Sequence, residues 1–148
     1  MKKHVKAIVA GVCGRMGSMI AKLVCEQSDM ELVGAIERQG HPAIGVDAGE
    51  KVDCGKIGVP VGERLEEVIG SGEVVIEFTN PETTIDHLEI AASNHRAIVI
   101  GTTGLNEAQV ARIKERSGTI PIVYSSNMSM GMNLMFKLAS GYSKDIGR

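Results

Sequence analysis

Short apolar runs alternate with segments of helical periodicity along most of the chain. Five runs rich in Val, Ile and Ala predict strands of a buried parallel sheet, and they cover residues 5–10, 31–36, 73–79, 97–100 and 120–124. Pro121 lies in the last run and has no backbone N–H to donate, which favours an edge strand or the start of a strand.

Helical patterns fill most of the intervals between these runs. After the first run, apolar residues recur at the spacing of an amphipathic helix, whose apolar face is predicted to contain Met16, Met19, Ile20, Leu23 and Val24. Asn80 followed by Pro81 predicts the start of a second helix, and Asn106 predicts the start of a third. A last helix is expected over about residues 129–139.

The alternation of strands and helices indicates a parallel sheet with helices on both faces, which is a doubly wound α/β fold. A chain of 148 residues has the length of one domain with a hydrophobic core, so we expect residues 1–148 to form a single domain. The glycine-rich segment 38–62 has no periodicity, and the pattern alone assigns it no role.

Composition narrows the range of partners. The formal charge is −2 and only 3% of residues are aromatic, which is unlike the basic and base-stacking surfaces that bind nucleic acid. No apolar run is long enough to span a membrane. Cys13, Cys25 and Cys54 form neither a CxxC pair nor an even set, so we expect reduced thiols and a cytoplasmic location.

The segment GVCGRMG, residues 11–17, leaves the first predicted strand and opens the first predicted helix. Its glycines have the spacing GxxGxxG instead of the usual GxGxxG, and a tight turn alone would also account for them. The strand–turn–helix–strand context favours a phosphate-binding turn, in which backbone N–H groups and the helix dipole hold a pyrophosphate. We interpret the fold as a Rossmann-like dinucleotide-binding domain.

Glu37 strengthens this interpretation, because it stands 20 residues after Gly17 at the end of the second predicted strand. An acidic side chain there binds the hydroxyl groups of the adenosine ribose, as in NAD sites. Arg38 is placed to pair with a 2′-phosphate, as in NADP sites, with Arg15 as a second cation. A solvated charge pair is the alternative, but the spacing favours a site that uses NADH or NADPH.

The remaining strand ends are also polar. They read Thr79-Asn80, Gly101-Thr102-Thr103 and Ser125-Ser126-Asn127, which predicts a binding edge. From the residues alone, GTTG at 101–104 is either a strand-to-helix turn or a contact for a nicotinamide or a substrate carboxylate. The four histidines, at 4, 41, 87 and 95, lack metal-ligand spacing, so no metal site is expected.

Several motifs together resemble a known family. VAGVCGRMG, GAIER, GVDAGE with CGKIGVPV, VVIEFTNPETT, VIGTTGLNE and SSNMSMGMNLM occur in the order found in dihydrodipicolinate reductases. These enzymes, also called 4-hydroxy-tetrahydrodipicolinate reductases, act in the diaminopimelate and lysine pathway. The resemblance covers nearly the whole chain and is to the N-terminal, nucleotide-binding domain of the family.

The resemblance implies hydride transfer from NADH or NADPH to a cyclic, dicarboxylate substrate. It implies that the pyrophosphate lies on Gly11, Val12, Cys13, Gly14, Arg15 and Met16, and that Glu37 and Arg38 contact the adenosine ribose. Thr79 ends the predicted strand 73–79 and is counted among the cofactor-binding residues. The nicotinamide end is implied to be lined by Gly101, Thr102, Thr103, Ser125, Ser126, Asn127 and Met128, and Thr103 also to contact a substrate carboxylate.

The catalytic domain of the family carries a His-His pair with a nearby Lys and a Ser-Gly-Thr segment, and no pair of adjacent histidines occurs here. We therefore expect no catalytic residue in this chain, and cofactor binding without turnover. The family's homotetramer is built largely through that second domain, so it is not expected for this chain. The alternatives are a stand-alone nucleotide-binding or redox-sensing module, and a dehydrogenase of the homoserine type.

Overall fold

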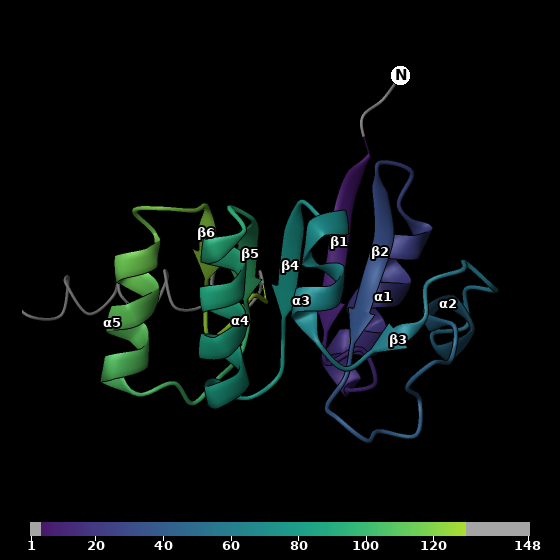
Figure 1. Cartoon of the computed structure of the whole chain (residues 1–148), viewed down its shortest axis with the longest axis horizontal. Helices are drawn as coiled ribbons and strands as arrows, with labels where there is room; N and C mark the ends of the chain where they lie inside the picture. The colour runs from purple at the N-terminus through teal and green to yellow at the C-terminus, as the bar shows by residue number, and fades with distance from the viewer. Residues whose placement is uncertain (1–3, 130–148) are drawn as a thin grey trace, which may run out of the picture.

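The structure, a computed structural model that describes residues 4–129, is built around one parallel sheet (Figure 1). The sheet has six strands in the order β3-β2-β1-β4-β5-β6. The strands are β1 (Val5–Ala10), β2 (Met30–Ile36), β3 (Val61–Gly62), β4 (Val74–Glu77), β5 (Ala97–Ile100) and β6 (Ile122–Tyr124). Because the chain leaves β1 first toward β2 and β3 and then toward β4, β5 and β6, the sheet is doubly wound, and the predicted fold class is confirmed.

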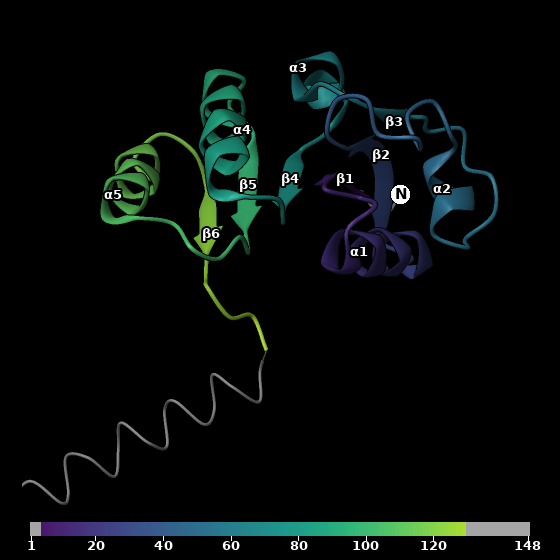
Figure 2. The same cartoon turned by 90° about the horizontal axis from the view of Figure 1, so that it is seen from below.

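Helices lie on both faces of this sheet (Figure 2). They are α1 (Arg15–Glu26), α2 (Ala48–Lys51), α3 (Leu65–Val68), the single 3₁₀ turn η1 (Ile69–Ser71), α4 (Pro81–Ser93) and α5 (Glu107–Arg116). Alternate residues of β1 enter two separate cores: Ala7 and Val9 pack with α1 and α2, whereas Ile8 and Ala10 pack with α3 and α4. This burial on both faces explains why β1 reads as a continuous apolar run.

The start of α1 packs very closely on the turn that follows β1. A Cβ atom on Gly17 would lie 1.9 Å from the carbonyl oxygen of Gly11, so only glycine fits there. The buried face of α1 consists of the small residues Gly17 and Ala21 together with Val24. The predicted apolar face was therefore largely wrong, because the close packing leaves Met16, Met19 and Leu23 exposed by 49%, 60% and 53%.

Segment 38–62 contains ordered elements that the sequence pattern did not reveal. Asp47 organises the segment: its carboxylate caps α2 by accepting the N–H groups of Gly49 and Glu50 at 3.0 and 3.2 Å. The same carboxylate accepts the N–H groups of Ile57 and Gly58 at 3.1 and 2.7 Å. The segment then ends in β3, which pairs with the last two residues of β2.

The other predicted boundaries fit the structure with small shifts. Asn80 and Asn106 cap α4 and α5 as expected, and β6 is an edge strand that begins just after Pro121. β4 ends at Glu77, two residues earlier than predicted, so Thr79 lies in the turn before α4. The helix expected over about residues 129–139 lies almost wholly outside the described residues.

We expect Gly17→Ala to lower the free energy of unfolding by about 2 kcal/mol or more, because the new methyl group overlaps backbone that cannot move independently. Gly70→Ala is the control, since a Cβ at Gly70 meets nothing within 4 Å. That control should change stability by less than about 0.5 kcal/mol. Urea unfolding of both variants measures the difference, and equal changes would contradict the packing described for α1.

Asp47→Asn should destabilise the protein at neutral pH. Partial desolvation of the Asp47 carboxylate raises its pKa, but the four backbone N–H groups outweigh it, so the pKa lies below its usual value. A carboxyl group whose pKa is lowered by folding stabilises the protein above its unfolded pKa, and this stabilisation is lost as pH falls through the folded pKa.

The gap in urea midpoint between wild type and Asp47→Asn should therefore be largest near neutral pH and shrink below about pH 4. Asp53→Asn serves as the matched control, because Asp53 is exposed and lies in the same segment. A gap that stays constant from neutral to acidic pH would show that the Asp47 charge does not organise the segment.

Candidate functional site

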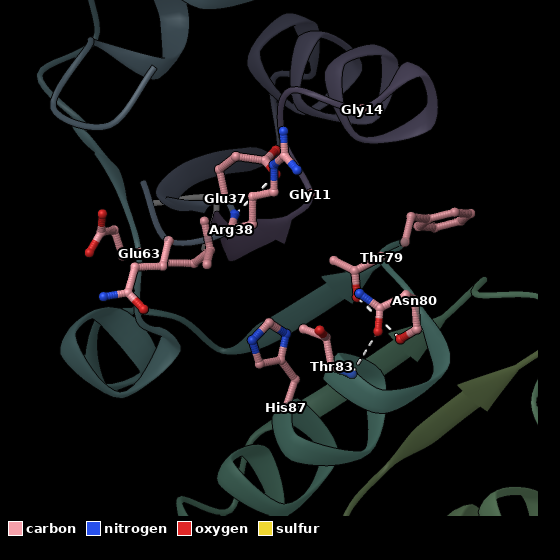
Figure 3. Close-up of a pocket in the computed structure, with 12 residues that line it drawn as sticks. Gly11, Gly14, Glu37, Arg38, Glu63, Thr79, Asn80, Thr83 and His87 are labelled. Atoms are coloured by element: carbon pink, nitrogen blue, oxygen red, sulfur yellow. Dashed lines mark hydrogen bonds between the residues drawn. The ribbon is translucent and has the colours of Figure 1, made fainter. Parts of the chain in front are cut away.

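Two adjoining cavities open at the carboxyl ends of the strands. The first has a volume of about 490 Å³ and includes Gly11, Gly14, Glu37, Arg38 and Thr79 in its wall (Figure 3). The second, of about 770 Å³, brings together many of the other predicted residues: Arg15, Met16, Gly101, Thr102, Thr103, Ser126, Asn127 and Met128. Gly14, Phe78 and Thr79 belong to both walls, so the two cavities meet there.

The start of α1 lies at this meeting point with its backbone donors unpaired. Gly14 is the N-cap and offers no side-chain acceptor, and the first turn carries no acidic residue. Among the described residues, no acceptor reaches the N–H groups of Arg15, Met16 or Gly17. By contrast, asparagine side chains cap α4 and α5. An uncapped helix start with free N–H groups and a positive dipole end favours an anion.

Glu37, directly after β2, closes the other side of the glycine turn. Its Oε2 accepts the N–H of Cys13 at 3.0 Å, and its Oε1 accepts the N–H of Arg38, also at 3.0 Å. The Arg38 side chain is exposed at the mouth of the first cavity, whereas Arg15 lines the second. The structure thus places the acid and one cation together and does not bring the two arginines into one cavity.

Three predicted residues do not line either cavity. Val12 is fully buried in the core, and its N–H donates to the carbonyl of Ile36 at 3.2 Å. Ser125 donates its hydroxyl to the carbonyl of Asn127 at 2.7 Å and so shapes the turn after β6. Cys13 is half-buried; burial, followed by the charge of Glu37, raises the pKa of its thiol above the usual value. Its position near a helix start therefore does not activate it as a nucleophile.

The turn after β5 lies against Phe78, from the turn after β4. A Cβ on Gly101 would lie 2.1 Å from the Phe78 ring, so a side chain at this position would displace the ring. The Thr102 hydroxyl is buried and accepts from Thr84 at 2.8 Å, whereas Thr103 is exposed. Of the two GTTG threonines, Thr103 has the more accessible side chain for a ligand.

A buried polar group beneath these turns was missed by the sequence interpretation. Glu77 ends β4 and is fully buried, and its Oε2 lies 2.5 Å from Nδ1 of His87 on α4. The sequence analysis considered the histidines only as metal ligands, and it therefore missed that His87 lines the first cavity. The ten-residue separation crosses a strand end and a helix start, so no simple periodic pattern connects the two residues. The sequence did contain one sign of this buried group, because Glu77 is a charged residue within the apolar run VVIEF.

Comparison with known proteins identifies the fold and the family. The family model described as dihydrodipicolinate reductase, N-terminus, matches residues 5–128. The chain belongs to this family. A 4-hydroxy-tetrahydrodipicolinate reductase of Syntrophus aciditrophicus (strain SB) is 41% identical over 142 residues, which are 96% of this chain and 53% of the relative. A protein of the same name from Desulfotalea psychrophila (strain LSv54 / DSM 12343) is 43% identical, again over 96% of this chain and 53% of the relative.

The chain thus spans about half the length of the curated relatives it matches. A solved structure of dipicolinate-bound dihydrodipicolinate reductase from Paenisporosarcina sp. TG-14 has a TM-score of 0.74 to this chain, covering 93% of it and 52% of that protein. At 24% identity this likeness supports the fold alone. Within residues 4–129, no three His, Cys, Asp or Glu side chains lie close enough together to hold a metal ion. No helix in this part of the chain is both long and apolar enough to cross a membrane.

Alkylation of Cys13 tests the electrostatics of the glycine turn. In a Cys25→Ser, Cys54→Ser background, Cys13 should react with iodoacetamide at pH 8 more slowly than a free cysteine peptide, because its raised pKa leaves less thiolate. Glu37→Gln should accelerate the reaction, since it removes a negative charge that opposes the thiolate. A rate at or above that of the peptide would contradict the arrangement described for Cys13 and Glu37.

Proposed function

We propose that this chain is the NAD(P)H-binding domain of a 4-hydroxy-tetrahydrodipicolinate reductase. The observation that carries the proposal is the uncapped start of α1, whose free N–H groups face the two cavities beside Glu37. The family match and the half-length relatives support the same assignment. A stand-alone redox sensor is not favoured, since the chain shares both its family model and about 40% identity with the reductases.

The pyrophosphate is assigned to the turn from Gly11 to Met16, where backbone donors substitute for positively charged side chains. Within this turn, Val12 acts through its backbone and its packing, since its side chain is buried. The adenosine ribose is assigned to Glu37, whose carboxylate already faces the first cavity. Arg38 is the cation for a 2′-phosphate, so NADH and NADPH are both proposed as cofactors.

The nicotinamide is assigned to the second cavity, between the turn after β5 and the turn after β6. Gly101, Thr102 and Thr103 form one wall, and Ser126, Asn127 and Met128 form the other, with Ser125 holding that turn in shape. Thr103 is also the proposed contact for a carboxylate of the substrate. The bound cofactor supplies the hydride, and this chain supplies its orientation and the shielding of one face.

Turnover is not proposed for the chain alone. Positioning of a dicarboxylate substrate and donation of a proton require groups that the cavities of residues 4–129 do not provide, since their walls hold no second histidine and no lysine. We propose a cytoplasmic domain, residues 1–148, that binds cofactor and acts on a small dicarboxylate only together with a catalytic domain. A homotetramer is not proposed for this chain.

Calorimetric titration with NADH and NADPH tests the proposal. Both should bind, and Arg38→Ala should weaken NADPH about tenfold or more while changing NADH little, because a charge-assisted hydrogen bond contributes about 1.5–3 kcal/mol. Glu37→Ala should weaken both cofactors. Arg64→Ala is the control, since Arg64 is exposed and pairs with Glu66, outside both cavities. Failure of both cofactors to bind at millimolar concentration to folded protein would refute the proposed function.

A further inference from the structure

Glu77 is a fully buried carboxylate whose two oxygens have different partners. Oε1 accepts the backbone N–H of Thr79 at 2.9 Å and the Thr79 hydroxyl, and it also lies 3.5 Å from the Thr84 hydroxyl. Oε2 contacts Nδ1 of His87 at 2.5 Å. These bonds join the end of β4, the turn after it and the first turns of α4, so the carboxylate has one fixed orientation.

His87 has one ring nitrogen bound in this way and the other toward the first cavity. The residue is 8% exposed and lines the cavity wall (Figure 3). Within the described part of the chain, Nε2 has no hydrogen-bond partner, and it is not among the buried unpaired polar atoms. A histidine that only satisfied Glu77 would not need an accessible second nitrogen at a cavity wall.

Glu77 also determines which nitrogen of His87 carries the hydrogen. An ionised carboxylate only accepts, so Nδ1–H donates to Oε2. A neutral imidazole bound in this way presents a lone pair at its other nitrogen, because the bond made by one ring nitrogen sets the state of the other. In that form, Nε2 of His87 offers the cavity a hydrogen-bond acceptor, which suits a ligand group that donates.

The position of His87 indicates which part of the ligand it meets. This step rests on the proposed function, which assigns the pyrophosphate to the glycine turn and the ribose to Glu37. The base attached to that ribose then occupies the rest of the same cavity, whose wall includes Gln39, Glu63, Thr83 and His87. Figure 3 shows the His87 imidazole projecting from α4 beside Thr83, on the side of the cavity opposite Arg38.

We propose that His87, held by Glu77 with its hydrogen on Nδ1, accepts a hydrogen bond at Nε2 from the 6-amino group of the adenine base. The pair Glu77–His87 thereby selects a 6-amino purine over a 6-oxo purine, which carries an acceptor at the same place. His87 is the specificity-determining residue, and Glu77 is a positioning residue that acts through it.

The test compares NADH with reduced nicotinamide hypoxanthine dinucleotide, which differs at the purine by an oxygen in place of the amino group. Binding to the 148-residue chain is followed through the fluorescence of the reduced nicotinamide, which both ligands share. The wild-type protein should bind NADH about five- to tenfold more tightly, the usual effect of one hydrogen bond gained and one lost. Equal affinities would overturn the inference and leave the proposed function intact.

Glu77→Gln separates this role from a merely structural one. The glutamine oxygen must accept from Thr79, so its NH₂ group faces His87 and donates to Nδ1, which moves the imidazole hydrogen to Nε2. The cavity then contains a donor, and the preference for NADH should disappear or reverse toward the 6-oxo ligand. A structural role alone would weaken both ligands equally and leave their ratio unchanged.

His87→Asn keeps a donor near Glu77 but removes the group at Nε2, so it should abolish the preference while retaining binding. Thr83→Val, also in the cavity wall, should retain the preference and serves as the matched control. Thermal melting of each variant without ligand shows whether it folds. If Glu77→Gln does not fold, His87→Asn alone tests the inference. Retention of the full preference in His87→Asn would overturn the inference, whereas failure of the wild type to bind either dinucleotide would overturn the proposed function as well.

Discussion

The contact between the start of α1 and the turn after β1 determines the geometry of the site. No side chain fits between Gly17 and the Gly11 carbonyl, so helix and turn approach as two bare backbones. This approach places the first N–H groups of α1 at the carboxyl edge of the sheet without a capping side chain. Stability and the proposed anion binding thus depend on the same glycines, because a side chain there would push the helix away from the turn.

Two acidic residues flank this turn and have different structural roles. β1 lies between β2 and β4 in the sheet, and those two neighbours end at or beside Glu37 and Glu77. Glu37 is partly accessible and holds the N–H of Cys13 at the cavity mouth. Glu77 is buried and holds the turn before α4 from below. The divergence of the chain on either side of β1 leaves a crevice between these residues, as is general in doubly wound sheets.

Sequence patterns predicted those parts of the fold that depend on interactions between residues close together in the chain. The strands follow from apolar runs, and the starts of α4 and α5 follow from asparagine caps at positions 80 and 106. The buried face of α1 could not be predicted from hydrophobicity, because close packing on the turn selected Gly17 and Ala21 over larger apolar residues. The structure of segment 38–62 could not be predicted for another reason. Asp47 organises the segment by accepting backbone N–H groups, and such bonds leave no pattern of side chains in the sequence.

The candidate site also contains residues that the sequence predicted and one that it did not. Gly14 and Glu37 were predicted from their places after strands, and Thr103 was predicted from the family resemblance. The structure gathers all three at one edge of the sheet. His87 escaped notice because its importance comes from a partner on another element, at a distance that only the folded chain defines. Long-range polar pairs of this kind are the part of a site that a single sequence does not encode visibly.

The central claim is that the backbone from Gly11 to Met16 holds the pyrophosphate of a dinucleotide. Its most direct test is the change in amide chemical shifts of ¹⁵N-labelled protein on addition of ADP-ribose, which contains the pyrophosphate but no nicotinamide. The account predicts the largest changes at the amides of Gly14, Arg15 and Met16, with Gly40 and Gly118 unaffected. Saturable binding that leaves the amides of the glycine turn unchanged would contradict it.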